Sequence, residues 1–261
     1  MGYALITGAS GGIGRELAAL FAADGHDLVI TARSQERLDM IKTKLEQRFG
    51  VHVVTFAIDL SEANAPKKLH DFTTSQGIAV DHLVNNAGFA DWTDFLDADW
   101  NRQNEMMQLN MHALAELTYR YGRDLRANGH GRILNISSVA SMMAGPYMAM
   151  YFASKAFVRS LSEAVAHELR GTGVTVTCVC PGPTTTGFQK AANMSGRNFF
   201  NDQTGHRTSA CHVRLPQDDA RLNPRLPWSA HQGGRARGTG SSPRSDPANR
   251  RVHERRQAAH A

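Results

Sequence analysis

A glycine-rich turn near the start of the chain constrains its fold more than any other feature. The apolar run at residues 3–7 leads into Thr7-Gly8-Ala9-Ser10-Gly11-Gly12-Ile13-Gly14, and residues 15–23 have a helical pattern. Glycines let a backbone approach a bound group closely, and the helix start adds free N–H groups and a positive dipole end. Between a strand and a helix, such a turn predicts a phosphate site rather than a simple tight turn. The predicted contacts are Gly8, Ser10, Gly11, Gly12, Ile13 and Gly14.

Short apolar runs alternate with longer helical patterns over the first 190 residues. The predicted strands are residues 3–7, 27–32, 51–58, 81–85, 132–137 and 174–180, and the predicted helices are residues 15–23, 36–49, 65–76, 100–128 and 151–171. Runs such as Leu28-Val29-Ile30 are apolar without a break, which is typical of parallel strands covered on both faces. The alternation predicts an α/β fold, a doubly wound parallel sheet in a single Rossmann-like domain, residues 1–190, with ligands beyond the carboxyl ends of the strands.

Charge is distributed unevenly along the chain. Residues 1–190 hold 17 Lys and Arg and 19 Asp and Glu, whereas residues 191–261 hold 12 Arg, no Lys and 5 acids. The net charge of +5 therefore comes from the last 71 residues, which argues against nucleic-acid binding by the body of the protein. Only nine of these 71 are Val, Ile, Leu, Met, Phe, Trp or Tyr, too few to offset chain entropy by burial. We expect residues 191–261 to form an irregular or disordered tail.

Two origins of this arginine-rich tail are compatible with its composition. It is either a genuine basic extension able to contact an acidic partner, or the product of a frame shift. Arg without Lys, together with Pro, Gly, Ala and His, is what a GC-rich gene gives when it is read out of frame. One choice of codons for residues 215–229, shifted by one base, encodes a string that resembles a helix end, a turn and a strand. The nucleotide sequence of codons 191–230 distinguishes the two origins.

The sequence has no pattern of a targeting or membrane segment. The amino end lacks a basic region, and no apolar run reaches the ~18 residues that cross a bilayer. We therefore expect a cytoplasmic protein without a membrane span. Cys178 and Cys180 alternate in a predicted strand, too tightly joined for an ordinary disulfide, and are interpreted as structural thiols. Because no His cluster accompanies them, we expect no metal site.

The end of the second predicted strand indicates which dinucleotide the chain prefers. An acidic residue there would bind the adenosine ribose hydroxyls, but this strand ends in Ala32-Arg33. A guanidinium matches the charge of a ribose 2′-phosphate, which a carboxylate would repel. Arg33 therefore favours NADP(H), and NAD(H) is the alternative if Arg33 is simply a solvated surface residue.

Three polar side chains between residues 138 and 155 indicate proton-transfer chemistry. Tyr151 and Lys155 are four residues apart and so share one face of a predicted helix. A free tyrosine has a pKa of ~10, and a neighbouring ammonium is expected to lower it. Ser138 ends a strand thirteen residues earlier, where its hydroxyl can hold a substrate oxygen beside Tyr151. A Tyr–Lys pair alone is usually structural, but with the serine and the glycine-rich turn it predicts catalysis.

With these motifs in place, residues 3–190 resemble the short-chain dehydrogenase/reductase family. The resemblance implies that Asp59, in the Asp59-Leu60 pair, holds the adenine amino group and that Asn86, Ala87 and Gly88 line the cofactor. The segment Pro181-Gly182-Pro183-Thr184-Thr185-Thr186 resembles the loop that contacts the nicotinamide carboxamide. The implied contacts from these motifs are Asp59, Leu60, Asn86, Ala87, Gly88, Tyr151, Lys155, Pro181, Gly182, Thr184 and Thr186.

The same resemblance implies a catalytic tetrad of Asn110, Ser138, Tyr151 and Lys155. Its reaction is hydride transfer between the nicotinamide cofactor and a carbonyl or alcohol, with Tyr151 as general acid and base. Ser138 would polarise the carbonyl oxygen, Lys155 would bind the nicotinamide ribose, and Asn110 would interrupt a helix and support a water. Family members commonly pair through the two long helices of this region, so we expect a homodimer or homotetramer.

Two features bear on the substrate. Five residues between Ser138 and Tyr151 favour a hydrophobic carbonyl or alcohol, namely Met142, Met143, Tyr147, Met148 and Met150. The resemblance stops after Lys190, although the family continues with a substrate-covering segment, a helix and a strand. A catalytically impaired or silent cofactor-binding protein is therefore the alternative function.

Overall fold

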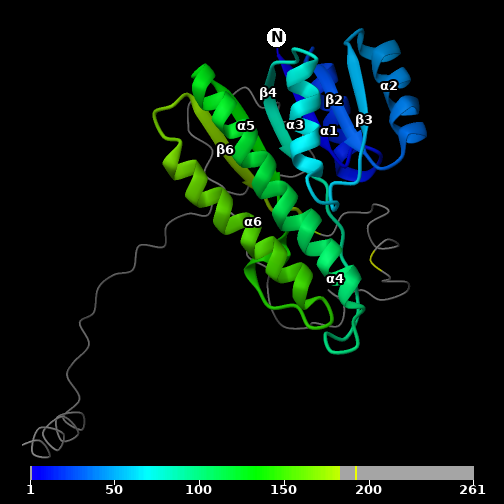
Figure 1. Cartoon of the computed structure of the whole chain (residues 1–261), viewed down its shortest axis with the longest axis vertical. Helices are drawn as coiled ribbons and strands as arrows, with labels where there is room; N and C mark the ends of the chain where they lie inside the picture. Colours follow the sequence, from blue (N-terminus) through cyan, green and yellow to red (C-terminus); the bar gives the residue numbers. More distant parts are fainter. Residues whose placement is uncertain (1, 183–191, 193–261) are drawn as a thin grey trace, which may run out of the picture. The chain divides into compact units, whose positions relative to one another are not determined.

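The alternating apolar runs form one six-stranded parallel sheet with the strand order β3-β2-β1-β4-β5-β6 (Figure 1). The computed structural model describes residues 2–182 and Ala192. The strands are β1 (Tyr3–Thr7), β2 (Asp27–Ala32), β3 (Val53–Ala57), β4 (Val80–Asn85), β5 (Gly131–Ile136) and β6 (Val174–Val179). The predicted fold class, a doubly wound parallel α/β sheet, is confirmed.

The helices connect these strands in the predicted alternation. They are α1 (Gly12–Ala23), α2 (Gln35–Phe49), α3 (Ala65–Ser75), α4 (Trp100–Met107), α5 (Leu114–Asn128) and α6 (Ala149–Glu168). A π-helical segment, η1 (Gln108–Ala113), joins α4 to α5, and a 3-10 turn, η2 (Val139–Met142), precedes α6. No helix in the described part of the chain is both long and apolar enough to cross a membrane.

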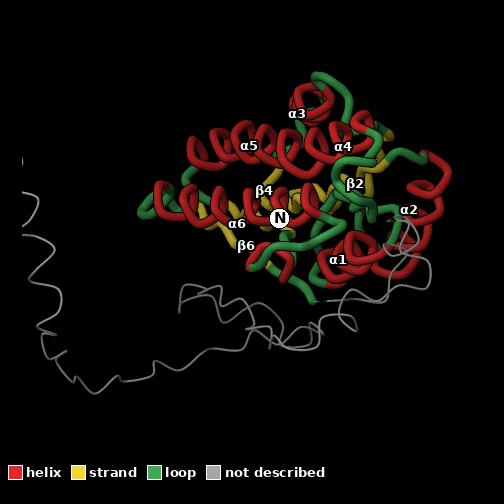
Figure 2. The backbone as a smooth tube through the Cα atoms, turned by 90° about the horizontal axis from the view of Figure 1, so that it is seen from below, coloured by secondary structure: helices red, strands yellow, loops and turns green. Residues whose placement is uncertain are grey.

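Strand side chains alternate between two apolar layers, as a period of two requires. Leu28 and Ile30 are buried with residues of α1 and α2, whereas Val29 between them is buried with residues of α3 and α5. Figure 2 shows α1 on one side of the strands and α3 and α5 on the other. Because both faces are covered along β2, this strand has no polar side, which explains its continuous apolar run.

Several predicted boundaries were wrong by a few residues. The helix predicted from residue 15 begins at Gly12, and the one predicted at 151–171 is α6, residues 149–168. The strand predicted at 51–58 is shorter, residues 53–57. The single helix predicted at 100–128 is divided by η1, where one extra residue enters the helical turn. Periodicity alone does not detect this insertion, because apolar residues continue on both sides of it.

The strand order reverses beside β1, and this determines where a ligand can bind. The chain leaves β1 through the glycine-rich turn toward β2, and it leaves β4 on the other side through residues 86–99 toward β5. Diverging loops at such a point leave a crevice beyond the carboxyl ends of the strands. The predicted division at residue 190 and the tail at 191–261 lie beyond the described segment 2–182.

Candidate active site

The glycine-rich turn is packed closely on its inner side and open on its outer side. Gly8 has φ +68°, and a Cβ there would lie 2.9 Å from the Ala87 Cα. A Cβ on Gly14 would lie 2.4 Å from the Gly8 carbonyl oxygen, whereas one on Gly11 would meet no atom of the described residues within 4 Å. Both Gly8 and Gly14 are therefore required by close backbone packing, and Gly11 leaves space for a ligand. Among the described residues no side chain caps the start of α1, so no side-chain cap uses the N–H donors of its first turn.

The segment after β4 fixes this turn in place. The Asn86 side chain donates a hydrogen bond to the Thr7 carbonyl oxygen at 2.9 Å, and the Thr7 hydroxyl oxygen accepts the N–H groups of Asn86 and Ala87 at 2.9 and 3.0 Å. Asn86 was predicted as a cofactor contact. In the structure its carboxamide joins the ends of β1 and β4, so it shapes the crevice through the backbone of the turn.

Arg33 and Asp59, predicted separately, lie together beyond the carboxyl ends of the neighbouring strands β2 and β3. The Arg33 guanidinium is 3.8 Å from a carboxylate oxygen of Asp59, and the Arg33 side chain is 81% exposed. The other Asp59 oxygen accepts the N–H and hydroxyl of Ser61 at 2.9 and 2.6 Å. Leu60, which lies between Asp59 and Ser61 in the sequence, is buried in the core. These residues fit a nucleotide, because a solvated guanidinium beside a held carboxylate can meet both a 2′-phosphate and an adenine amino group.

Tyr151 and Ser138 face each other at the carboxyl end of β5. Tyr151 is buried in the first turns of α6, and burial raises the pKa of its hydroxyl to about 12 although a hydrogen bond with Ser138 acts to lower it. The Ser138 oxygen also accepts the N–H of Ala140 at 3.1 Å, which orients the serine at the start of η2. The fold therefore keeps Tyr151 protonated at neutral pH, in contact with a second hydroxyl.

Lys155 is buried beneath the Tyr151 ring, with its Nζ 5.8 Å from the ring centroid. Its ammonium donates a hydrogen bond to the Ile136 carbonyl oxygen at 2.9 Å, and burial lowers the pKa of Lys155 to about 8. This ammonium was expected to lower the pKa of Tyr151, but burial of the tyrosine hydroxyl raises that pKa instead.

Asn110 lies in η1, and its buried side chain makes three hydrogen bonds. Its Oδ1 accepts the Phe89 N–H at 3.1 Å, and its Nδ2 donates to the Phe89 carbonyl oxygen at 2.9 Å and to the Ser154 hydroxyl at 3.1 Å. Ser154 in turn donates to the Tyr151 carbonyl oxygen at 2.7 Å. A Cβ on Gly88 would lie 2.9 Å from Asn110 Oδ1 and 3.5 Å from Lys155 Nζ. The four predicted catalytic residues are therefore brought together around Gly88 and α6.

Sequence reasoning missed several groups that hold this site. Ser154 and the backbone of Phe89 orient Asn110, and Ser137 donates to the Lys155 carbonyl oxygen at 2.8 Å. Ser154 had a detectable signal, since it is a polar residue between Tyr151 and Lys155 on the buried side of the helix. The Phe89 backbone had none, because main-chain donors do not appear in a residue pattern.

The methionine-rich segment before Tyr151 contributes an apolar wall. Met148 is buried with Tyr151 and Phe152, and Met143 and Met150 pack against the same cluster. Met142 is not part of that cluster. Tyr147 is half-exposed, has φ +63° and stacks on Trp92 with ring centroids 5.7 Å apart.

The loop after β6 is described only in part. The Pro181 carbonyl oxygen accepts the Val139 N–H at 3.1 Å, which joins this loop to η2 beside Ser138, and a Cβ on Gly182 would meet no atom of residues 2–182 within 4 Å. Thr184 and Thr186 lie outside the described residues. Ala192 is buried in the cluster around Tyr151, and its carbonyl oxygen accepts the Trp92 N–H at 3.0 Å.

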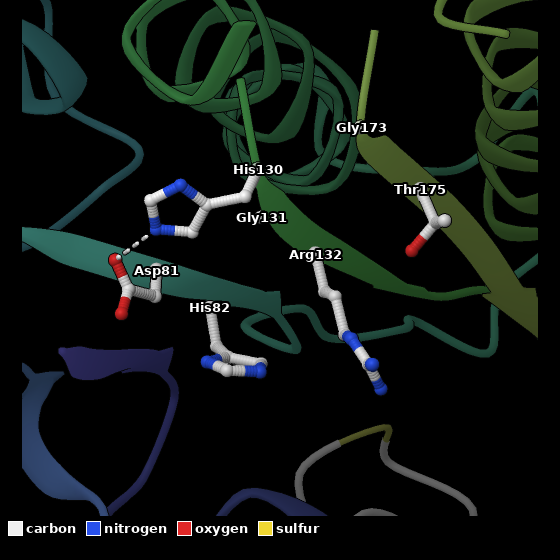
Figure 3. Close-up of a pocket in the computed structure, with 7 residues that line it drawn as sticks. All are labelled: Asp81, His82, His130, Gly131, Arg132, Gly173 and Thr175. Atoms are coloured by element: carbon white, nitrogen blue, oxygen red, sulfur yellow. Dashed lines mark ion pairs between the residues drawn. The ribbon is translucent and has the colours of Figure 1, made fainter. Parts of the chain in front are cut away.

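A cavity of about 260 Å³ lies at the amino-terminal ends of β4, β5 and β6 (Figure 3). Its lining comprises Asp81, His82, His130, Gly131, Arg132, Gly173 and Thr175. The His130 ring is directed toward Asp81, with 3.5 Å between Nε2 and Oδ1. This cavity is at the opposite end of the strands from Tyr151. In residues 2–182, no group of three or more His, Cys, Asp or Glu side chains is placed to bind a metal ion.

Comparisons with known proteins agree with this architecture. The family model of short chain dehydrogenases matches residues 2–195. Sulfoacetaldehyde reductase 2 of Chromohalobacter salexigens is 38% identical over 189 residues, which cover 70% of this chain and 73% of that protein. Very-long-chain 3-oxoacyl-CoA reductase of Neurospora crassa is 31% identical over 232 residues, 88% of this chain and 70% of that protein.

A solved structure gives the same result in three dimensions. The short-chain dehydrogenase from Sphingobium yanoikuyae in complex with NADPH is 32% identical and superposes with a TM-score of 0.71 over 77% of each chain. The family-model match to residues 2–195 includes the parallel sheet and the helices that carry the candidate site. The chain therefore belongs to the short-chain dehydrogenase family, as an NAD(P)-dependent oxidoreductase that acts on CH–OH groups.

Proposed function

We propose that the chain is an NADP(H)-dependent carbonyl reductase, and in reverse an alcohol dehydrogenase, in which Tyr151 donates and accepts the proton. The observation that carries this proposal is the placement of Tyr151, whose hydroxyl is hydrogen-bonded with Ser138 at the carboxyl end of β5 and whose ring centroid lies 5.8 Å from Lys155 Nζ. A phenol held beside a second hydroxyl can protonate a carbonyl oxygen that lies between the two groups.

Each member of the tetrad has a task that follows from its position. When bound, NADPH supplies the hydride to the carbonyl carbon. Tyr151 gives its proton to the carbonyl oxygen, so that the C=O bond becomes CH–OH, and Ser138 donates a hydrogen bond to the same oxygen. Lys155 holds the nicotinamide ribose through its ammonium. Asn110, fixed by Phe89 and Ser154, supports the water that returns a proton to Tyr151.

The preference for NADP(H) rests on Arg33. Its guanidinium is solvent-exposed beside Asp59, where the negative charge of a ribose 2′-phosphate would be neutralised. The similar Sphingobium yanoikuyae protein was solved with NADPH. We expect Arg33→Asp to weaken NADPH binding by at least about tenfold, ~1.4 kcal/mol, while NADH binding changes less. Lys44→Asp, on the exposed face of α2, changes the net charge by the same amount and serves as the control. An unchanged preference for NADPH over NADH in Arg33→Asp would contradict the proposal.

The substrate we propose is a hydrophobic carbonyl compound. The cluster around Tyr151 contains Phe152 and Met148, with Trp92, Met143 and Met150 packed against it. Burial of a substrate methylene against such a wall contributes ~0.8 kcal/mol. Ketones of increasing apolar size should therefore show rising kcat/KM, whereas carboxylated or sulfonated carbonyls of equal size should not.

The deciding experiment is NADPH oxidation by purified protein across a panel of apolar and charged carbonyls. Turnover that is highest with apolar ketones supports the proposal. NADPH binding without turnover on any carbonyl would favour the alternative, a catalytically silent cofactor-binding protein. The predicted homodimer or homotetramer and the predicted cytoplasmic location are tested separately, by light scattering and by fractionation of cells.

A further inference from the structure

A buried acidic residue outside the tetrad lies between the β4 loop and α4. The side chain of Asp91 is 7% exposed, and its two oxygens accept Arg102 Nε at 2.9 Å and Gln103 Nε2 at 3.0 Å. Arg102 and Gln103 belong to α4, the helix that runs into η1 and Asn110. Asp91 therefore joins the loop after β4 to the helix that carries Asn110.

The same arginine reaches back to the residue that holds Asn110. The Arg102 guanidinium lies 4.8 Å from the centroid of the Phe89 ring, a cation–π contact. The backbone N–H and carbonyl oxygen of Phe89 provide two of the three hydrogen bonds of the Asn110 carboxamide, at 3.1 and 2.9 Å, and the third is to the Ser154 hydroxyl. Any rotation of the Phe89 segment therefore moves two of the hydrogen bonds of Asn110.

We infer that Asp91 and Arg102 are positioning residues that set the geometry of Asn110 through Phe89. The contacts form a closed ring: the Phe89 ring contacts Arg102 in α4, α4 runs into η1 with Asn110, and Asn110 binds the Phe89 backbone. Asp91 holds the Arg102 guanidinium in this ring. A planar guanidinium held by a buried carboxylate fixes an orientation that apolar packing alone would leave loose. The inference rests on the proposed function, because it matters for turnover only if Asn110 acts in the reaction.

The first test separates turnover from binding. We expect Asp91→Asn to lower kcat by about tenfold, since sub-ångström displacement of a catalytic group has effects of this order, while the Kd for NADPH stays within about twofold of the original value, ~0.4 kcal/mol. Glu105→Gln is the matched control, an exposed acid on the same helix α4, and it should leave kcat unchanged. A wild-type kcat in Asp91→Asn would overturn the inference.

The second test asks whether the effect passes through Asn110. In a double-mutant cycle, Asp91→Asn should lower kcat in the wild type but cause almost no further loss in an Asn110→Ala background. Losses that multiply would show that Asp91 acts independently of Asn110, and would overturn the inference while leaving the proposed function intact. An Asn110→Ala enzyme with full kcat would instead overturn the proposed role of Asn110 and the inference with it.

A further variant keeps the test decisive if Asp91→Asn does not fold. Phe89→Leu removes the ring beneath Arg102 but keeps the backbone groups that hold Asn110, and it leaves every charge in place. It should lower kcat in the wild type and have almost no effect in the Asn110→Ala background. Equal losses in both backgrounds would overturn the inference.

Discussion

Substitution of Gly88 by alanine tests the packing of the site most sharply, because the structure fixes the size of the collision. The added Cβ would lie 2.9 Å from Asn110 Oδ1, about 0.5 Å inside ordinary contact, and 3.5 Å from Lys155 Nζ. The carboxamide cannot move away freely, since Phe89 holds it with two hydrogen bonds. Displacement of a catalytic group by ~1 Å lowers rates about 100-fold, so half of that predicts a loss of about tenfold in kcat, or ~1.4 kcal/mol.

The assay is NADPH oxidation at saturating cofactor and ketone, with thermal unfolding measured on the same samples. Gly122→Ala in α5 provides the control, because its Cβ would lie 3.6 Å from Ile133 Cδ1 in β5, which is an ordinary contact distance. Alanine is the better helix former, so this variant should keep full kcat and unfold at the same or a higher temperature. A Gly88→Ala enzyme with wild-type kcat would refute the argument that Asn110 and Lys155 are fixed against Gly88.

Three further predictions concern cofactor binding and pH. Gly11→Ala adds a Cβ that meets no atom within 4 Å in the part of the chain that the structure describes, so stability should be unchanged while NADPH affinity falls about tenfold, ~1.4 kcal/mol. Unchanged affinity in a titration would contradict this. Burial beside His26 lowers the pKa of His82, which lines the cavity in Figure 3, from 6.5 to about 4. Between these two pH values the unfolded chain therefore binds more protons than the folded chain, so the free energy of unfolding should fall as pH drops from 6.5 to 4, by ~1–2 kcal/mol after screening at a partly exposed ring. Denaturation of His82→Gln at several pH values should show no such decrease. An identical decrease in this variant would contradict the assignment to His82. Burial lowers the pKa of Lys155 to about 8, so carbonyl reduction should decline as pH rises above 8, and a profile that stays flat well beyond that pH would contradict the role of its ammonium.

The sequence was sufficient to predict what depends on local pattern. Continuous apolar strands and the glycines of the first turn predicted the parallel sheet and the crevice, because both depend on backbone packing between neighbouring elements. Gly8 and Gly14 have the close approaches that the pattern indicated. Arg33 and Asp59 were predicted as separate contacts, and the topology brings them to 3.8 Å because β2 and β3 are neighbours.

What the sequence did not predict depends on burial and on the main chain. The pKa of Tyr151 was expected to fall because of Lys155, but the enclosing cluster raises it, and the depth of a side chain is not a local property. The interruption of the helix at Asn110 was expected only from the family resemblance, since an inserted residue leaves apolar periodicity almost intact. The ion pair of Asp91 and Arg102 joins residues eleven positions apart across a loop, a distance that no helical or strand period predicts.

The central claim is that Tyr151 transfers the proton, and Tyr151→Phe tests it most directly. The substitution removes the hydroxyl that contacts Ser138 and keeps the ring that lies over Lys155. NADPH binding should stay close to that of the wild type in a fluorescence titration, while turnover of a ketone that the wild type reduces should fall by at least about 1,000-fold, ~4 kcal/mol. Ketone reduction by Tyr151→Phe at a rate near that of the wild type would contradict the account.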